Sequence, residues 1–88
     1  MSPSSQIRVY ATKYCPDCHR AQKILDQRDI PYEYIDAAQD NDALAYIEQV
    51  NNGKRIVPTI VFPDGDILVE PSNQELNAKL DALGGQVG

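Results

Sequence analysis

The chain has 88 residues, a net charge of −5 and a hydrophobic fraction of 42%, which predicts one small globular domain over residues 1–88. Its acidity argues against nucleic acid as a partner, because phosphate binding needs a basic face. No apolar run approaches the roughly 20 residues of a transmembrane helix, so no membrane partner is expected. The opening MSPSSQ has neither the basic nor the apolar region of a secretory signal. We therefore expect a cytoplasmic protein with reduced thiols.

The first half of the chain shows alternating strand and helix patterns. Residues 6–11 (QIRVYA) alternate apolar and polar side chains, which is typical of a strand. Residues 16–29 have an apolar stripe at helical spacing and begin with a proline, which the first helical turn tolerates. A second strand is expected over residues 32–35. A second helix is expected to open near Asp40 and to stop at residues 51–53, Asn-Asn-Gly.

The second half of the chain predicts a hairpin followed by a helix. Residues 59–62 and 67–70 are apolar and join through 63–66 (PDGD), which has Asp-Gly at its centre, so we expect a β-hairpin there. The last helix is expected over residues 71–83. The leucines of this segment share one face and are predicted to be core: Leu76, Leu80 and Leu83.

The predicted order is β-α-β-α-β-β-α. A right-handed βαβ unit makes the first two strands parallel, and the hairpin adds antiparallel strands. The expected fold class is therefore α/β, with a mixed four-stranded sheet flanked by three helices. Residues 1–5 and 84–88 are expected to be flexible ends.

The two cysteines stand in the sequence CPDC, where the first helix begins. A structural disulfide between Cys15 and Cys18 would close a very short loop and add little stability. A zinc site within one chain lacks ligands, because His19 is the only histidine, although a cluster shared between two chains stays open. Unpaired N–H groups and the dipole at a helix start favour the nucleophilic thiolate. We therefore predict a redox dithiol in which Cys15 attacks, Cys18 resolves and Pro16 stiffens the turn.

Asp17 and Pro58 are predicted to support this dithiol. The acidic Asp17 suits a first helical turn. A carboxylate at this position also disfavours the thiolate form of the neighbouring cysteine and repels an anionic thiol substrate. Pro58 either marks the start of a strand or is a cis proline. In the second case the backbone of Val57 would be free to pair with an extended thiol peptide.

The segments CPDCHRAQKIL (15–25) and KRIVPTIVF (54–62) together resemble the glutaredoxins, whose motifs are typically CPYC and TVP. The chain is most similar to glutaredoxin-like bacterial proteins of the mycoredoxin type, over about residues 6–83. The resemblance implies a thioredoxin fold, Cys15 as nucleophile, Cys18 as resolving cysteine and a cis Pro58. It implies no bound cofactor, but a low-molecular-weight thiol as co-substrate, which could be glutathione, mycothiol or bacillithiol.

The same resemblance predicts a groove for the small thiol. Glutaredoxins usually carry a lysine three places before the nucleophile, where this chain has Thr12 followed by Lys13. The N-terminus of the last helix could hold a carboxylate through its free N–H groups. Ser72 is first of all expected to cap that helix, since Glu75 follows at capping-box spacing. The predicted thiol-binding residues are Thr12, Lys13, Tyr14, Val57, Ser72, Asn73 and Gln74.

These features predict an enzyme, a monomeric thiol–disulfide oxidoreductase that reduces protein disulfides or mixed disulfides. Its expected partners are a small thiol and disulfide-bearing client proteins. One alternative is an electron donor to ribonucleotide reductase, recharged by a flavin disulfide reductase of the thioredoxin reductase type. We rank this alternative second, because the chain has no tryptophan and shows PSNQEL at the start of its last helix. Another alternative is an iron–sulfur carrier that uses Cys15 of two chains.

Overall fold

The computed structural model describes residues 6–87, with side chains for residues 6–83. Residues 1–5 and 88, which belong to the predicted flexible ends, lie outside the described residues. No helix among the described residues is long and apolar enough to cross a membrane. The predicted order of elements is confirmed, as β1 (Ile7–Ala11), α1 (Pro16–Gln27), β2 (Tyr32–Asp36), α2 (Asn41–Val50), β3 (Thr59–Val61), β4 (Ile67–Val69) and α3 (Asn73–Val87).

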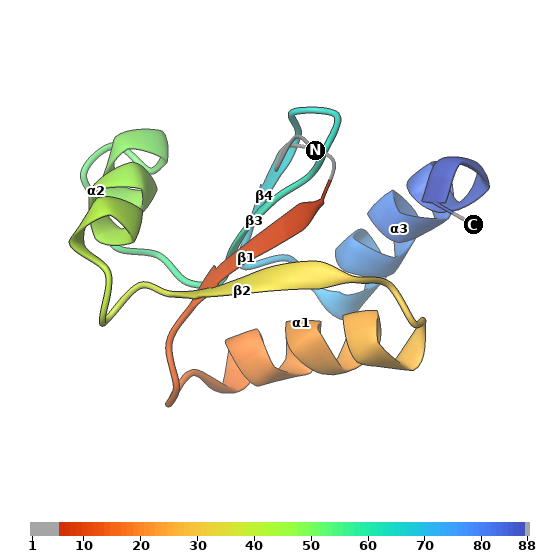
Figure 1. The fold of residues 1–88 in the computed structure, drawn as a ribbon, viewed down its shortest axis with the longest axis horizontal. Coiled ribbons are helices and arrows are strands. Elements are labelled where there is room, and N and C mark those ends of the chain that lie inside the picture. Colours follow the sequence, from red (N-terminus) through yellow and green to blue (C-terminus); the bar gives the residue numbers. More distant parts are fainter. Residues whose placement is uncertain (1–5, 88) are drawn as a thin grey trace.

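The strands form one mixed sheet in the order β2-β1-β3-β4 (Figure 1). Strands β1 and β2 are parallel, and Val9 lies opposite Tyr34. On its other side β1 pairs antiparallel with β3, where Val9 lies opposite Ile60, and β3 pairs antiparallel with β4. The predicted parallel pairing of the first two strands and the predicted antiparallel pairing of the hairpin strands are therefore confirmed. The carboxyl end of β1, a central strand, leads directly into the CPDC segment.

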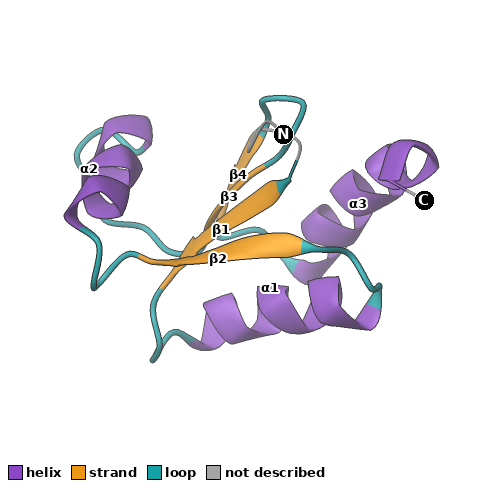
Figure 2. Cartoon of the chain, in the orientation of Figure 1, coloured by secondary structure: helices purple, strands orange, loops and turns teal. Residues whose placement is uncertain are grey.

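The helices cover both faces of the sheet. Helices α1 and α3 lie on one face and α2 on the other (Figure 2). The core between the sheet and α1 and α3 includes Leu25, and the smaller core under α2 includes Tyr10 and Ile47. The leucines of α3 are buried as predicted: Leu76, Leu80 and Leu83.

Local backbone conformation sets element ends that differ from the predicted ones. Helix α1 ends at Gln27 rather than residue 29, because Asp29 has φ +55°, in the left-handed region. Strand β4 ends at Val69, since Glu70 has φ +47°. Helix α3 continues to Val87, beyond its predicted end at residue 83. Glycine lowers helix propensity by only about 1 kcal/mol per residue, so two glycines did not end this helix.

Both ends of α2 follow their sequence signals. The Asp40 carboxylate accepts hydrogen bonds from the backbone N–H groups of Asp42 (3.0 Å) and Ala43 (3.1 Å), which caps the helix. Asn52 and Gly53 at the other end have positive φ, of 57° and 88°. This left-handed turn sends the chain toward Pro58 and β3.

Thr59 holds the segment that leads into β3. Its fully buried hydroxyl donates to the carbonyl of Ile56 (2.7 Å) and accepts from the side-chain amide of Asn51 (3.3 Å). These two bonds join the end of α2 to the residues on either side of Val57 and Pro58. Thr59 thereby links the hairpin to the loop beside the cysteines.

Replacing Thr59 with valine should lower the free energy of unfolding by about 1–3 kcal/mol, because the Ile56 carbonyl and the Asn51 amide lose their bonds to the buried hydroxyl. Urea unfolding followed by circular dichroism measures this. The matched control is Thr59→Ser, which keeps the hydroxyl and should lose less. A Thr59→Val variant as stable as wild type would show that these two hydrogen bonds do not stabilise the fold.

Candidate active site

Cys15 is the N-cap residue of α1. Its backbone is extended (φ −106°, ψ 107°), and its sulfur accepts a hydrogen bond from the backbone N–H of Cys18 at 3.1 Å. The sulfur also lies 3.9 Å from the carbonyl oxygen of Val57. Cys15 is half-buried, so one side of the thiol remains open. A sulfur held at a helix N-terminus by an N–H donor is in a position that favours the thiolate.

Cys18 lies one turn further and is fully buried. It packs in the core with Ala21 and Leu25. Burial, followed by its hydrogen bond with Cys15, raises the pKa of the Cys18 thiol to about 12. Both cysteines are free thiols in this structure. The two sulfurs therefore differ in kind, since one is accessible and the other is buried and protonated at neutral pH.

Two prolines flank the cysteines. Pro16 occupies the first position of α1 and is exposed. Pro58 is buried, and the bond between Val57 and Pro58 is cis. The structure thus selects the second of the two sequence interpretations of Pro58. Val57 contributes to both cores and presents its carbonyl to Cys15.

Asp17 lies between the cysteines with its side chain 52% exposed. Its carboxylate forms an ion pair with Arg20 at 2.9 Å, one turn further along the same helix. Arg20 also donates to the side chain of Asn73 at the start of α3 (2.7 Å). The bond between Arg20 and Asn73 joins residues 53 positions apart, so no local sequence pattern reveals it.

Thr12 and Val57, two of the predicted thiol-binding residues, line a common cavity of about 300 Å³. Lys13 and Tyr14 are exposed on the loop before Cys15, and Tyr14 is 92% exposed, so it does not cover the core. The sequence did not reveal the other side of the cavity, which comes from α2, its flanking loop and the approach to Pro58. The remaining lining residues are Ala37, Ala38, Leu44, Ile47 and Arg55.

The start of α3 carries the predicted capping box. Ser72 Oγ accepts from the N–H of Glu75 (3.0 Å), and the Glu75 carboxylate accepts from the N–H of Ser72 (2.9 Å). Asn73 is bonded to Arg20, and Gln74 is exposed. A ligand that approaches this helix would therefore meet side chains already engaged at Ser72 and Asn73.

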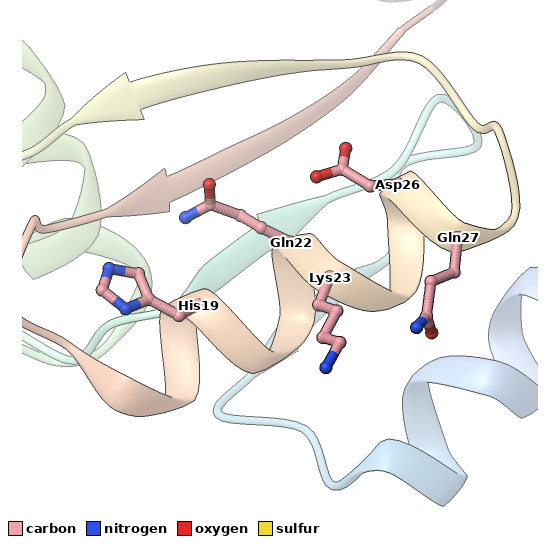
Figure 3. A pocket seen from close by; sticks show the side chains of 5 residues that line it. All are labelled: His19, Gln22, Lys23, Asp26 and Gln27. Carbon is pink, nitrogen blue, oxygen red and sulfur yellow. The ribbon is translucent and has the colours of Figure 1, made fainter.

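A second hollow, of about 420 Å³, lies away from the cysteines along the exposed flank of α1. All the side chains that line it come from this one helix (Figure 3). His19 lies at one end of it and is exposed. The lining residues are His19, Gln22, Lys23, Asp26 and Gln27, so neither cysteine takes part.

A mixed sheet with this strand order, a dithiol at the start of its first helix and a cis proline before β3 are the features of a thioredoxin-like thiol–disulfide oxidoreductase. The family model for glutaredoxin matches residues 7–68. The chain belongs to the glutaredoxin family.

The comparisons extend over nearly the whole chain. Mycoredoxin 1 of Corynebacterium glutamicum is 40% identical over 79 residues, which cover 90% of this chain and 98% of the relative. Among solved structures, the thioredoxin-like protein BC3987 has a TM-score of 0.73 at 25% identity, and the match covers 83% of this chain and 97% of that protein. The buckwheat glutaredoxin–glutathione complex has a TM-score of 0.74 at 25% identity, with 97% of this chain and 78% of that one covered.

Brief treatment of the reduced native protein with iodoacetamide at pH 7 should modify Cys15 and leave Cys18 unmodified. The reason is that Cys18 is 0% exposed and its pKa is raised to about 12. Peptide mass spectrometry gives the position of the label, and the same reaction in strong denaturant is the control that should label both residues. Preferential labelling of Cys18 in the native protein would contradict this assignment.

Folding raises the pKa of Cys18 from its ordinary value of 9.0 to about 12, so the unfolded chain loses this proton first as the pH rises. The stabilising contribution is complete below about pH 9 and is lost progressively as the pH rises toward about 12. Between about pH 8 and about pH 10, the free energy of unfolding of the reduced protein should fall by about 1.4 kcal/mol more than that of Cys18→Ala. Urea unfolding in excess reductant measures the difference, and parallel curves for the two proteins would refute it.

Proposed function

We propose that this protein reduces protein disulfides and protein mixed disulfides through Cys15 and Cys18, and that a low-molecular-weight thiol supplies the electrons. The observation that carries the proposal is the contrast between the two sulfurs. Cys15 is accessible and accepts the N–H of Cys18 at a helix start, whereas Cys18 is buried one turn behind it. This is the arrangement that an attacking and a resolving thiol require.

The first half-reaction uses both cysteines. The Cys15 thiolate attacks one sulfur of the client disulfide, that S–S bond breaks, and the first client sulfur leaves as a thiolate. The mixed disulfide that forms joins Cys15 to the second client sulfur. Cys18 then gives up its proton and attacks Cys15 Sγ, which releases the second client thiolate and leaves a Cys15–Cys18 disulfide. Two electrons have passed to the client.

Two molecules of small thiol then restore the dithiol. The first attacks Cys15, releases Cys18 as a thiol and remains attached to Cys15. The second attacks that mixed disulfide, so Cys15 returns to its reduced form and the oxidised small-thiol disulfide leaves. In an alternative half-cycle, Cys15 takes a small thiol directly from a protein mixed disulfide and Cys18 is not needed.

The proposed position of the client peptide is beside Val57. The Val57 carbonyl lies 3.9 Å from the Cys15 sulfur, so a chain that brings a disulfide to this sulfur passes along Val57. Backbone hydrogen bonds to Val57 would hold it as an added strand would be held. Such bonds are independent of side chains, which suits an enzyme with several clients. Pro16 and Pro58 support this arrangement by fixing the backbone on both sides of the sulfur.

We propose that the small thiol occupies the cavity lined by Thr12, Val57 and Arg55. Lys13 and Tyr14, which follow Thr12 and are exposed, would contact the part of the ligand that extends from this cavity toward Cys15. Arg55 pairs with Glu48 at 2.7 Å on the exposed surface and is the nearby cation for a carboxylate of the ligand. The first turn of α3, with the N–H groups of its early residues Asn73 and Gln74, would hold a second anionic group.

The proposed small thiol is mycothiol, glutathione or bacillithiol, and trapping on Cys15 distinguishes the three. Turnover depends on a reducing pool of such a thiol, so we propose the cytoplasm as the site of action. The similarity to mycoredoxin 1 does not favour a ribonucleotide reductase donor or an iron–sulfur carrier. A flavin disulfide reductase enters this scheme only as the enzyme that would reduce the small-thiol disulfide.

A Cys18→Ser variant should trap its substrates as stable disulfides on Cys15, because the resolving sulfur is missing. Incubation with the disulfide of mycothiol, of glutathione or of bacillithiol in turn, followed by intact mass measurement, identifies the small thiol by its mass. Incubation with cell extract identifies clients that a reductant releases. We expect a stable adduct with at least one of the three small thiols.

The matched control is Cys15→Ser, which retains Cys18 and should trap nothing, because Cys18 is buried. Wild-type protein should form only transient adducts. If Cys15→Ser formed the adducts and Cys18→Ser did not, the roles of the two cysteines would be reversed. If neither variant formed any adduct with the three disulfides or with extract proteins, the proposed function would be wrong.

A further inference from the structure

We infer that Arg20 is a positioning residue that tunes the reactivity of Cys15, and that it does so by holding and neutralising the Asp17 carboxylate. The inference rests on the proposed function, since it concerns the proposed nucleophile. It assigns a role to a residue that the sequence pattern did not place at the site. It also explains how an acidic residue can stand between two redox cysteines.

The Arg20 guanidinium bridges two elements. Nη2 donates to Asp17 Oδ1 at 2.9 Å within α1, and Nη1 donates to Asn73 Oδ1 at 2.7 Å at the start of α3. Nη1 also lies 3.5 Å from the carbonyl oxygen of Pro71, which is buried. The Arg20 side chain is 37% exposed. Acceptors on α1 and at the start of α3 together orient its guanidinium.

The charge of Asp17 opposes the chemistry proposed for Cys15. A carboxylate two residues from the sulfur disfavours a thiolate, and the helix N-terminus favours one. Arg20 carries a permanent positive charge, which offsets that of Asp17 at this helix start. Among the described residues, Arg20 is the only cation that forms an ion pair with Asp17.

Other ionisable groups surround the dithiol. On the preceding loop and on α1 these are Lys13, Tyr14 and His19, all exposed, and exposed charges are screened by water and salt. From β2, Tyr34 contributes a phenol whose pKa is raised, first by burial and then by nearby Asp36 and the two cysteines. These groups are shared by every variant compared below, so they do not produce differences between variants.

The contacts with α3 make the ion pair more than an ordinary surface pair. An isolated exposed pair at i,i+3 spacing contributes little, because two mobile side chains must be ordered. Here Asn73 and Pro71 already order the guanidinium, so less entropy is lost when Nη2 meets Asp17. The start of α3 thereby acts on the dithiol through Arg20 without touching either sulfur.

Arg28 offers a matched control on the same helix. It bonds Asn77 at 2.8 Å and Asp81 at 2.6 Å, both on α3, with 31% of its side chain exposed. It thus has the same chemistry as Arg20, an arginine held by one asparagine and one aspartate. It stands at the other end of α1, away from the cysteines.

The test measures the rate of Cys15 alkylation by iodoacetamide between about pH 4 and about pH 9 at low ionic strength. The rate follows the thiolate, and neither a client nor a small thiol is needed. Arg20→Gln should shift the rate profile to higher pH and slow alkylation about 3- to 5-fold on its acidic side, with the plateau unchanged, as expected for one well-ordered surface pair. Arg20→Lys should restore most of the rate, and Arg28→Gln should match wild type.

A double variant identifies Asp17 as the intermediary. In an Asp17→Asn background, Arg20→Gln should change the rate less than in wild type, because the carboxylate that Arg20 holds is gone and only the direct effect of the Arg20 charge is lost. Asn73→Ala keeps the charge of Arg20 but removes its hydrogen bond to α3, so it should shift the rate profile to higher pH by less than Arg20→Gln does. If Arg20→Gln does not fold stably, Asn73→Ala tests the inference in its place.

The inference is overturned if the Arg20→Gln and Asn73→Ala profiles coincide with wild type, if Arg28→Gln shifts the profile equally, or if Arg20→Gln has its full effect without Asp17. Failure of the proposed function is a separate outcome. Wild-type protein would then alkylate normally at Cys15 but would reduce no disulfide and trap no adduct. A shifted Arg20→Gln profile in that case still supports the role of Arg20.

Discussion

The hydrogen bond from the Cys18 N–H to the Cys15 sulfur is the interaction around which the rest of the site is arranged. It exists because Cys15 stands where extended backbone turns into helix, so the first N–H groups of α1 have no carbonyl to bond. A sulfur in that position satisfies one of these donors and gains the favourable field of the helix. The rest of the site does two things: it buries the partner Cys18, and it brings the segment of Val57 and Pro58 to the Cys15 sulfur.

Stability and chemistry share the same packing in this protein. Cys18 is part of the main core between the sheet and helices α1 and α3. The burial that fastens α1 to the sheet is also what keeps Cys18 protonated and protected. Cys15, by contrast, contacts the core only in part. The fold thereby makes two chemically identical side chains unequal through their burial and their place on the helix.

The order of the strands places the segment before β3 next to the cysteines. Because β3 runs antiparallel to β1, its start lies beside the end of β1, and Val57 and Pro58 reach the cysteines. A hydrogen bond from the Asn51 side chain to the Thr59 hydroxyl holds this segment against the end of α2. The beginning of α3 reaches the same end of α1 through Arg20 and Asn73. Segments distant in sequence therefore meet at one dithiol.

The sequence by itself determined what depends on neighbours along the chain. Hydrophobic period and turn residues predicted every element, including a helix start near Asp40. The capping-box spacing predicted the bonds between Ser72 and Glu75, and CPDC predicted a dithiol at a helix start. Only the tertiary structure decided the isomer of the Val57–Pro58 bond, the exposure of Tyr14, the cavity shared by Thr12 and Arg55, and the bond between Arg20 and Asn73. Those features depend on which remote segments pack against each other, and a local pattern carries no information about a partner 53 residues away.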